Sequence, residues 1–279
     1  GASGALVQDD AAFTINTNGM GTVGFFDGEG SLHSNLAWGV GALGTGSDYA
    51  GTMTIQYGND IDAETNIQYH TPADILPFGI TAKVGYAPNV GDTTGGNDFK
   101  SAGGINPANA GGNTLIQYRV DAAPIDGLSI GADYATEDGG DTGTAQSEES
   151  GAYYAKYAMG NFKVGYGKAL YAPSLSDKAG ATATVNDYET TSYGVEFAVN
   201  DALSVSYSVE KSDAVTKVAT AAGASGTTNT TVEADIDSIQ AAYVIGGATL
   251  GVAITETANA DYISGKDEKV TVFSIATEF

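Results

Sequence analysis

Carboxylates and hydroxyls are abundant in this 279-residue sequence, but no group of residues has the types and spacing of a known catalytic centre. His33 and His70 are the only histidines, and cysteine is absent. A disulfide scaffold, a thiolate zinc site and a thiol nucleophile are therefore excluded. No paired-histidine motif occurs, and no Gly-x-Ser-x-Gly elbow lies between a strand and a helix. We expect no enzymatic activity, no catalytic residue and no cofactor.

One acidic group deserves comparison with a metal site. It consists of carboxylates in polar, loop-like sequence, at Glu137, Asp138, Asp141, Glu148 and Glu149. Carboxylates on a flexible loop suit calcium, but this spacing does not match the EF-hand loop. We interpret the group as a solvated acidic rim and expect no metal site, with binding of a divalent cation as the alternative.

The overall charge narrows the possible partners. Lys and Arg number 11 against 34 Asp and Glu, which gives a formal net charge of −23. Nucleic acid would be repelled by this excess, so we expect no nucleic-acid partner. No apolar run reaches the roughly 18 residues of a membrane-spanning helix.

Alternating apolar and polar residues predict the elements that must position any functional side chains. The clearest stretch is Leu203–Glu210, where apolar residues alternate with small polar or charged ones. The pattern predicts an all-β antiparallel fold with about thirteen strands, most near the length of a membrane-barrel strand. The strands are expected at 13–15, 21–26, 63–70, 80–86, 113–121, 128–134, 151–159, 162–166, 193–199, 203–210, 237–245, 250–254 and 269–279.

Short and long connections alternate along the predicted strands. The short ones are 18–19, 71–79, 122–127, 160–161, 200–201 and 246–247, where Asn and Gly tolerate the positive φ of tight turns. The long ones are 27–62, 88–112, 136–150, 172–187, 212–231 and 258–268. Tight turns at one end and long loops at the other are typical of an outer-membrane barrel.

The two faces of the predicted sheet differ in polarity. The alternation alone does not decide which face points inward, because a soluble barrel would bury the apolar one. Aromatic residues favour the membrane arrangement, since they gather at both ends of the strands on the apolar face. One ring contains Tyr86, Tyr134, Tyr166 and Tyr193; the other contains Tyr69, Tyr118, Tyr157, Phe162, Phe197 and Phe279.

Three segments resemble a known family. The last strand, with Phe273, Ile275 and a C-terminal Phe279, resembles the terminal strand that the bacterial barrel-assembly machinery reads. Residues 13–24 and the pair 66–72 and 78–88 resemble the hairpins before and after the inward-folded third loop of general diffusion porins. The order and spacing of these segments match the family, and the resemblance covers essentially the whole chain.

The resemblance implies a sixteen-stranded antiparallel transmembrane β-barrel, usually a homotrimer, in the bacterial outer membrane. Its implied partners are outer-membrane lipid, lipopolysaccharide, the barrel-assembly machinery and small hydrophilic solutes. Residues 1–279 would form one barrel domain. The odd strand count and the early position of the 27–62 segment lead us to expect about three further strands upstream of Gly1. The alternative is an extra strand at 52–57 in a smaller, complete barrel.

The segment 27–62 is expected to fold into the lumen as the pore-constriction loop. Residues 31–38 suggest a helical turn, from which Leu32, Leu36 and Trp38 would pack against the wall. The candidate loop residues are Asp27, Glu29, His33, Trp38, Asp48 and Asp60, with His33 interpreted as a polar loop residue. The candidate lumen-wall residues are Lys83, Arg119, Lys156, Lys163, Glu64, Asp133 and Glu196.

These residues predict a passive diffusion channel for small hydrophilic solutes and ions. Loop carboxylates at the narrowest point would make it weakly cation-selective, moderated by the basic wall residues. The alternative is an acidic structural or adhesive cell-surface protein without channel activity. That alternative accounts for the charge and the missing cysteine, but not for Phe279 or the regular alternation of connections.

Overall fold

The structure is a computed structural model that describes residues 11–51, 53, 55–72, 75–90, 113–138, 144–173, 175–176, 184–219 and 227–277. Its strands are β1 (Ala11–Asn16), β2 (Thr22–Asp27), β3 (Asn66–His70), β4 (Thr81–Val90), β5 (Asn113–Ile125), β6 (Leu128–Asp138), β7 (Thr144–Gln146), β8 (Glu149–Met159), β9 (Phe162–Ala172), β10 (Leu175–Ser176), β11 (Thr184–Ala198), β12 (Leu203–Ala219), β13 (Thr227–Ile245), β14 (Ala248–Ala258) and β15 (Glu268–Thr277). Short 3-10 helices are η1 (Ser47–Tyr49), η2 (Ile61–Ala63), η3 (Pro77–Gly79) and η4 (Ala260–Tyr262). Among the described residues, none of the helices has the length and apolar character needed to cross a membrane.

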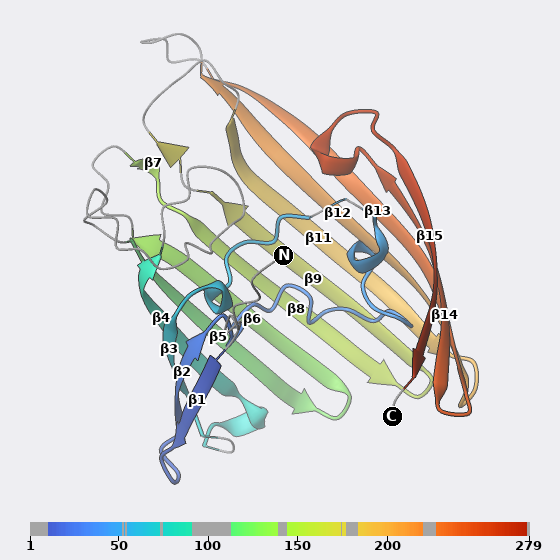
Figure 1. The fold of residues 1–279 in the computed structure, drawn as a ribbon, viewed down its shortest axis with the longest axis horizontal. Coiled ribbons are helices and arrows are strands. Elements are labelled where there is room, and N and C mark those ends of the chain that lie inside the picture. The colour runs from blue at the N-terminus through green and yellow to red at the C-terminus, as the bar shows by residue number, and fades with distance from the viewer. Residues whose placement is uncertain are drawn as a thin grey trace, which may run out of the picture.

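Thirteen strands form one antiparallel sheet in which each strand pairs with the next along the chain. Only β7 and β10 stand apart, as a separate two-stranded pair. In Figure 1 the sheet curls from β1 at one side to β15 at the other. Within the described residues, β1 and β15 each have one neighbour, so they are the sheet edges. The all-β antiparallel architecture and the thirteen strands confirm the prediction from alternation.

The sheet is polar on the inside and apolar on the outside. On β12 the inner side chains include Ser206, Ser208 and Glu210, which are buried, while Val205 and Tyr207 on the other face are exposed. A soluble barrel would have the opposite arrangement, because its apolar side chains would be removed from water. The question that the alternation left open is therefore answered: the apolar face points outward.

The tight turns use the residues predicted for them. Asn18 and Gly19 both have positive φ at the β1–β2 turn, and Gly246 and Gly247 do so between β13 and β14. Positive φ is the conformation that two-residue hairpin turns require and that Asn and Gly tolerate. These turns fix the register of the adjoining strands.

Several predicted boundaries are wrong. The strand expected at 63–70 begins only at Asn66, because η2 occupies 61–63. The connection expected at 212–231 is strand at all of its described residues, 212–219 and 227–231, and the one expected at 172–187 includes the start of β11. These strands are long: β11, β12 and β13 have 15, 17 and 19 residues. Their β-branched and small residues pair across strands to Lys217 and beyond. The extra strand considered at 52–57 is absent from the described residues there, 53 and 55–57.

The connection between β2 and β3 lies across one face of the sheet. We call residues 28–65 the β2–β3 loop and the face that it covers the inner face. In Figure 1 this blue segment passes in front of the central strands. The loop reaches the far side of the sheet, since η1 contacts β14 and β15.

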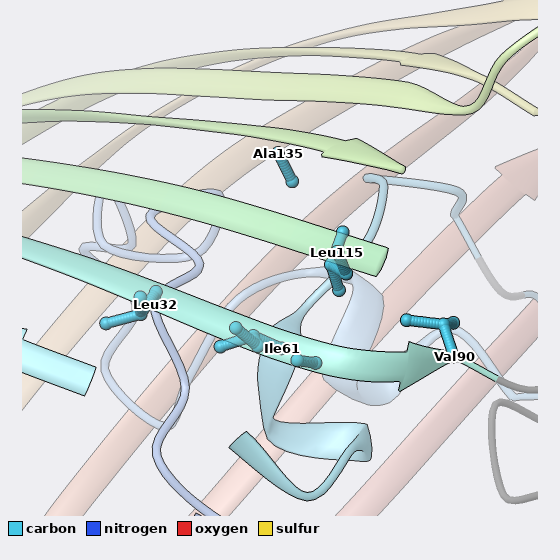
Figure 2. Close-up of a cluster of buried hydrophobic side chains, with 6 residues drawn as sticks. Leu32, Ile61, Val90, Leu115 and Ala135 are labelled. Atoms are coloured by element: carbon cyan, nitrogen blue, oxygen red, sulfur yellow. The ribbon is translucent and has the colours of Figure 1, made fainter. Parts of the chain in front are cut away.

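Two apolar clusters hold the β2–β3 loop against the sheet, one near both of its ends and one at its middle. Near β3 to β6, Leu32 and Ile61 from the loop pack with Val90, Leu115 and Ala135 (Figure 2). On the far side, Ala50, Met53 and Ile55 pack with Ala234, Ile236 and Ala260. The core of the protein thus lies between the loop and the wall rather than between two sheets.

Candidate functional site

Polar side chains of the inner face capture the backbone of the β2–β3 loop. An extended loop exposes amide groups that need acceptors when they are buried. Wall side chains supply six such acceptors, and all six hydrogen bonds are 2.7–3.0 Å long: Asp133 for Ser34, Ser206 for Ala42, Gln240 for Leu43, Glu210 for Ser47, Ser150 for Asn59 and Gln117 for Ile61. The loop is therefore attached along its whole length.

Trp38 packs against strand β9 and holds its part of the loop there. Its side chain is fully buried. A Cβ atom on Gly167 would lie 2.5 Å from Trp38 Cδ1, and one on Gly165 would collide with the Trp38 carbonyl oxygen. Glycine at these two inner positions therefore makes room for the indole and its backbone.

The turn that carries Trp38 matches the expectation only in part. Ala37 N donates to Ser34 O and Gly39 N donates to Leu36 O, which is a hydrogen-bonded turn rather than a helix. Leu32 is buried as expected. The expectation for Leu36 is wrong, because its side chain is 43% exposed. It lies on the outer side of the turn, away from the wall that Trp38 contacts.

Arg119 ties the loop to strand β5. Its Nη1 donates to the carbonyl oxygen of His33, and its Nε donates to Asp121 Oδ2 at 2.7 Å. The guanidinium is thus shared between a loop carbonyl and a wall carboxylate, a geometry that its fixed fork of donors suits. Arg119 is an anchor for the loop as well as a wall charge.

The remaining basic wall residues lie on the same inner face. Lys83 is the cross-strand partner of Arg119, and Lys156 is the partner of Gly165 beneath Trp38. Lys163 pairs with Glu196 at 3.1 Å. Neither Lys83 nor Lys156 has a carboxylate within ion-pair distance among the residues that the structure describes. Two uncompensated positive charges therefore face the space beside the loop.

Most of the candidate loop carboxylates have local hydrogen-bonding roles. Asp60 accepts from Leu32 N at 3.0 Å and from Ser31 Oγ, so it joins the two arms of the loop. Asp48 accepts from Thr45 N at 2.8 Å, and Asp27 accepts from Thr65 Oγ1 at 2.6 Å. Glu29 is exposed. Glu29, Asp48 and Asp60 lie on the loop, whereas Asp27, expected there too, is the last residue of β2. Asp27, Asp48 and Asp60 are also structural acceptors.

Glu64 lies at the end of the loop rather than on a wall strand, because β3 begins two residues later. Its side chain is largely buried, with the residue 8% exposed and Oε1 without a hydrogen-bond partner among the described residues. Burial, together with the nearby charge of Glu137, raises the pKa of Glu64 to about 7. This carboxyl group therefore titrates near neutral pH.

His33 is a polar residue of the β2–β3 loop whose side chain is largely buried. Its side chain is 10% exposed, and its Nδ1 lies 3.7 Å from Asp133 Oδ2. Burial lowers the pKa of His33, but the carboxylates of Asp133 and Asp60 outweigh it, so the pKa is raised above 6.5.

Several functional residues were missed by sequence reasoning. Four neutral acceptors hold the loop: Gln117, Ser150, Ser206 and Gln240. The sequence identifies them only as members of an alternating polar face. Glu210 is not among the predicted wall residues, although it is fully buried and accepts from Ser47 N and from Tyr57 Oη. The only hint in the sequence is a large acid within the serine-rich stretch 204–212.

The edge strand β15 presents its bulky residues outward. Phe273 is 80% and Ile275 is 75% exposed. Phe279, the third residue of the expected assembly signal, lies outside the described residues, as does Asp141 of the acidic group. Among the described residues, no three His, Asp or Glu side chains are grouped to hold a metal ion.

Comparison with known proteins identifies the fold. No protein-family model matches the sequence, and a search of curated proteins finds no match. Among solved structures, OmpF of Salmonella typhi in complex with daunomycin is 13% identical with a TM-score of 0.61, covering 96% of this chain and 77% of that one. A porin refined at 1.8 Å is 16% identical with a TM-score of 0.57, covering 93% and 79%. The anion-selective porin of Comamonas acidovorans is 16% identical with a TM-score of 0.52, covering 96% and 88%. The thirteen-stranded antiparallel sheet of this chain, which is not closed within the described residues, therefore has the fold of the porins to which it is similar.

Proposed function

We propose that the protein is a passive diffusion channel of the bacterial outer membrane for small hydrophilic solutes and ions. One observation carries this proposal: a long loop is bound to the polar inner face of a sheet whose outer face is apolar. Polar side chains keep such an interior hydrated, while apolar ones match lipid. The β2–β3 loop would then be the pore-constriction loop, and solutes would pass beside it.

The outer face supports a membrane location. Tyr86, Tyr134, Tyr166 and Tyr193 are exposed there, as are Tyr69, Tyr118 and Phe162. Tyr118 is the direct cross-strand partner of Tyr134, so the predicted division into two rings is wrong for this pair. Exposed aromatic side chains on the apolar face nevertheless suit the interfaces of a bilayer. Outer-membrane lipid and lipopolysaccharide would be the surrounding molecules.

Closure of the barrel is part of the proposal. Open strand edges leave amide and carbonyl groups without partners, which hydrocarbon does not tolerate. In a closed barrel the groups along β1 and β15 would be paired, as in the sixteen-stranded barrel that the resemblance implies. Assembly as a homotrimer, with insertion by the barrel-assembly machinery through the β15 residues, follows from the same resemblance.

The selectivity that we propose is weak preference for cations. The net charge of −23 and the carboxylates of Asp27, Glu29 and Asp48 favour it. Lys83 and Lys156, which have no ion-pair partner within the described part of the chain, oppose it. Only charges close to the passage count, because salt screens interactions beyond roughly 10 Å.

Reversal potentials under a salt gradient in planar bilayers test this selectivity. We expect a small cation preference in the unmodified protein and a larger one in the Lys83→Glu and Lys156→Glu variants. Lys269→Glu, on the outer side of β15, is the matched control and should not change the potential. A clear anion preference in the unmodified protein would contradict the proposed sign.

Extraction from membranes separates the channel from an acidic surface-layer protein. A barrel should need detergent for release and should migrate differently on a gel before and after heating. Release by salt or chelator alone would favour the surface-layer function instead.

A further inference from the structure

Two buried polar groups face each other beneath the β2–β3 loop without a completed interaction. Neither ring nitrogen of His33 has a hydrogen-bond partner among the described residues, and the same is true of Asp133 Oδ2. The His33 side chain is nine-tenths buried, and that of Asp133 is fully buried, with 3.7 Å between Nδ1 and Oδ2. A buried carboxylate without a cation is costly, and an imidazolium at this position would supply the opposite charge as well as a donor.

The charges around His33 come from three elements. Strand β6 contributes Asp133, whose Oδ1 already accepts from Ser34 N at 2.7 Å. The returning arm of the loop contributes Asp60 and Asp62, both of which interact electrostatically with His33. Strand β5 contributes Arg119, but its guanidinium is paired with Asp121. The returning arm also brings the backbone of Gly58 next to His33. On strand β8, the carbonyl oxygen of Ala152 is neutral and accepts from Ser34 Oγ, beside His33, at 3.3 Å.

We propose that His33 and Asp133 form a proton-operated latch for the β2–β3 loop. Protonated His33 completes an ion pair with the fully buried Asp133 and fastens residues 31–38 to β6. Loss of the proton leaves a neutral imidazole beside an unpaired buried carboxylate, and this part of the loop is held less tightly. The latch concerns attachment of the loop and does not depend on channel activity.

The direction with pH follows from linkage. The pKa of His33 is raised in the attached loop, so attachment is favoured below the ordinary value of 6.5 and is weakened as pH rises through the raised value. Each unit of that increase corresponds to about a tenfold change in the attachment equilibrium. Glu64 has a raised pKa too and would act in the same direction, so the test must separate the two groups.

Trp38 provides a native reporter, because it is the only tryptophan and lies in the latched segment. Acrylamide quenching of its fluorescence should increase between about pH 5 and about pH 9, with a midpoint above the ordinary histidine value. In His33→Gln this transition should disappear, and quenching should stay near the high-pH value of the unmodified protein. Glu64→Gln is the matched control and should retain the transition.

Two results would overturn the latch. One is quenching that does not change with pH in the unmodified protein. The other is a transition that persists in His33→Gln and disappears in Glu64→Gln, which would assign the effect to the Glu64 carboxyl group.

Imidazole nitrogen NMR gives an independent measurement, since the chain has only two histidines and His70→Gln leaves one. His33 should titrate above its ordinary value, and in Asp133→Asn its pKa should fall. Titration of His33 at or below the ordinary value would also contradict the proposal.

Discussion

Replacing Gly167 by alanine tests whether Trp38 is seated on β9 as described. The added Cβ would lie 2.5 Å from Trp38 Cδ1 and 2.8 Å from Cγ, whereas ordinary contact begins at 3.4 Å. The indole must therefore move by about 0.9 Å, the difference between 3.4 and 2.5 Å. Because Trp38 is fully buried and the contact is near the root of its ring, it has no free rotamer to adopt.

The expected penalty is that of an overpacked core, about 1–3 kcal/mol. It should act on attachment of the loop and not on the sheet, because alanine in a strand loses less backbone entropy on folding than glycine. Gly167→Ala should thus loosen the loop while leaving the strands intact.

Acrylamide quenching of Trp38 measures this loosening, and far-ultraviolet circular dichroism checks the strands. Quenching should rise in Gly167→Ala. Gly151→Ala on β8 is the control, since the closest atom to its Cβ would be the Asp133 carbonyl oxygen at 3.2 Å and no loop atom is near. Equal quenching in the two variants would refute the described packing of Trp38 against β9.

Three further substitutions have defined expectations. Glu210→Ala removes the acceptor of Ser47 N and of Tyr57 Oη. Hydrogen exchange of the backbone amides of residues 45–50 should accelerate by tenfold or more, because a buried unsatisfied group costs about 1–3 kcal/mol. Unchanged hydrogen exchange would contradict this role of Glu210. Phe273→Arg places a charge on the outer face of β15, which in a membrane meets lipid. It should lower the free energy of unfolding, measured by urea titration, by about 2–4 kcal/mol. Lys163→Ala should change that free energy by less than about 1 kcal/mol, since its ion pair with Glu196 is 51% exposed on the lysine side; a larger loss would mean that Lys163 supports the fold.

The sheet was predictable because its information is local. A period of two along Leu203–Glu210 identifies a strand without knowledge of its partners, and Asn18-Gly19 identifies a turn. The ends of β11–β13 were not predictable in this way, because Thr, Ala and Asp occur on both faces there and read as loop. Cross-strand pairing with an equally long neighbour is what extends them.

The loop site depends on contacts that sequence patterns do not encode. Ser47 and Glu210 are 163 positions apart, and Ser34 and Asp133 are 99 apart. Trp38 could be expected to seek the wall because an indole is poorly placed in water. Burial of His33 and exposure of Leu36 depend on how one turn is oriented over the sheet, which no local pattern specifies.

Single-channel conductance in planar bilayers tests the central claim most directly. The purified protein should form stable, ohmic channels, and removal of residues 30–46 should increase their conductance. The deletion must pull Ser47 away from Glu210 on β12, so the remaining loop cannot keep its place across the inner face. Absence of channels, or an unchanged conductance after the deletion, would contradict the account.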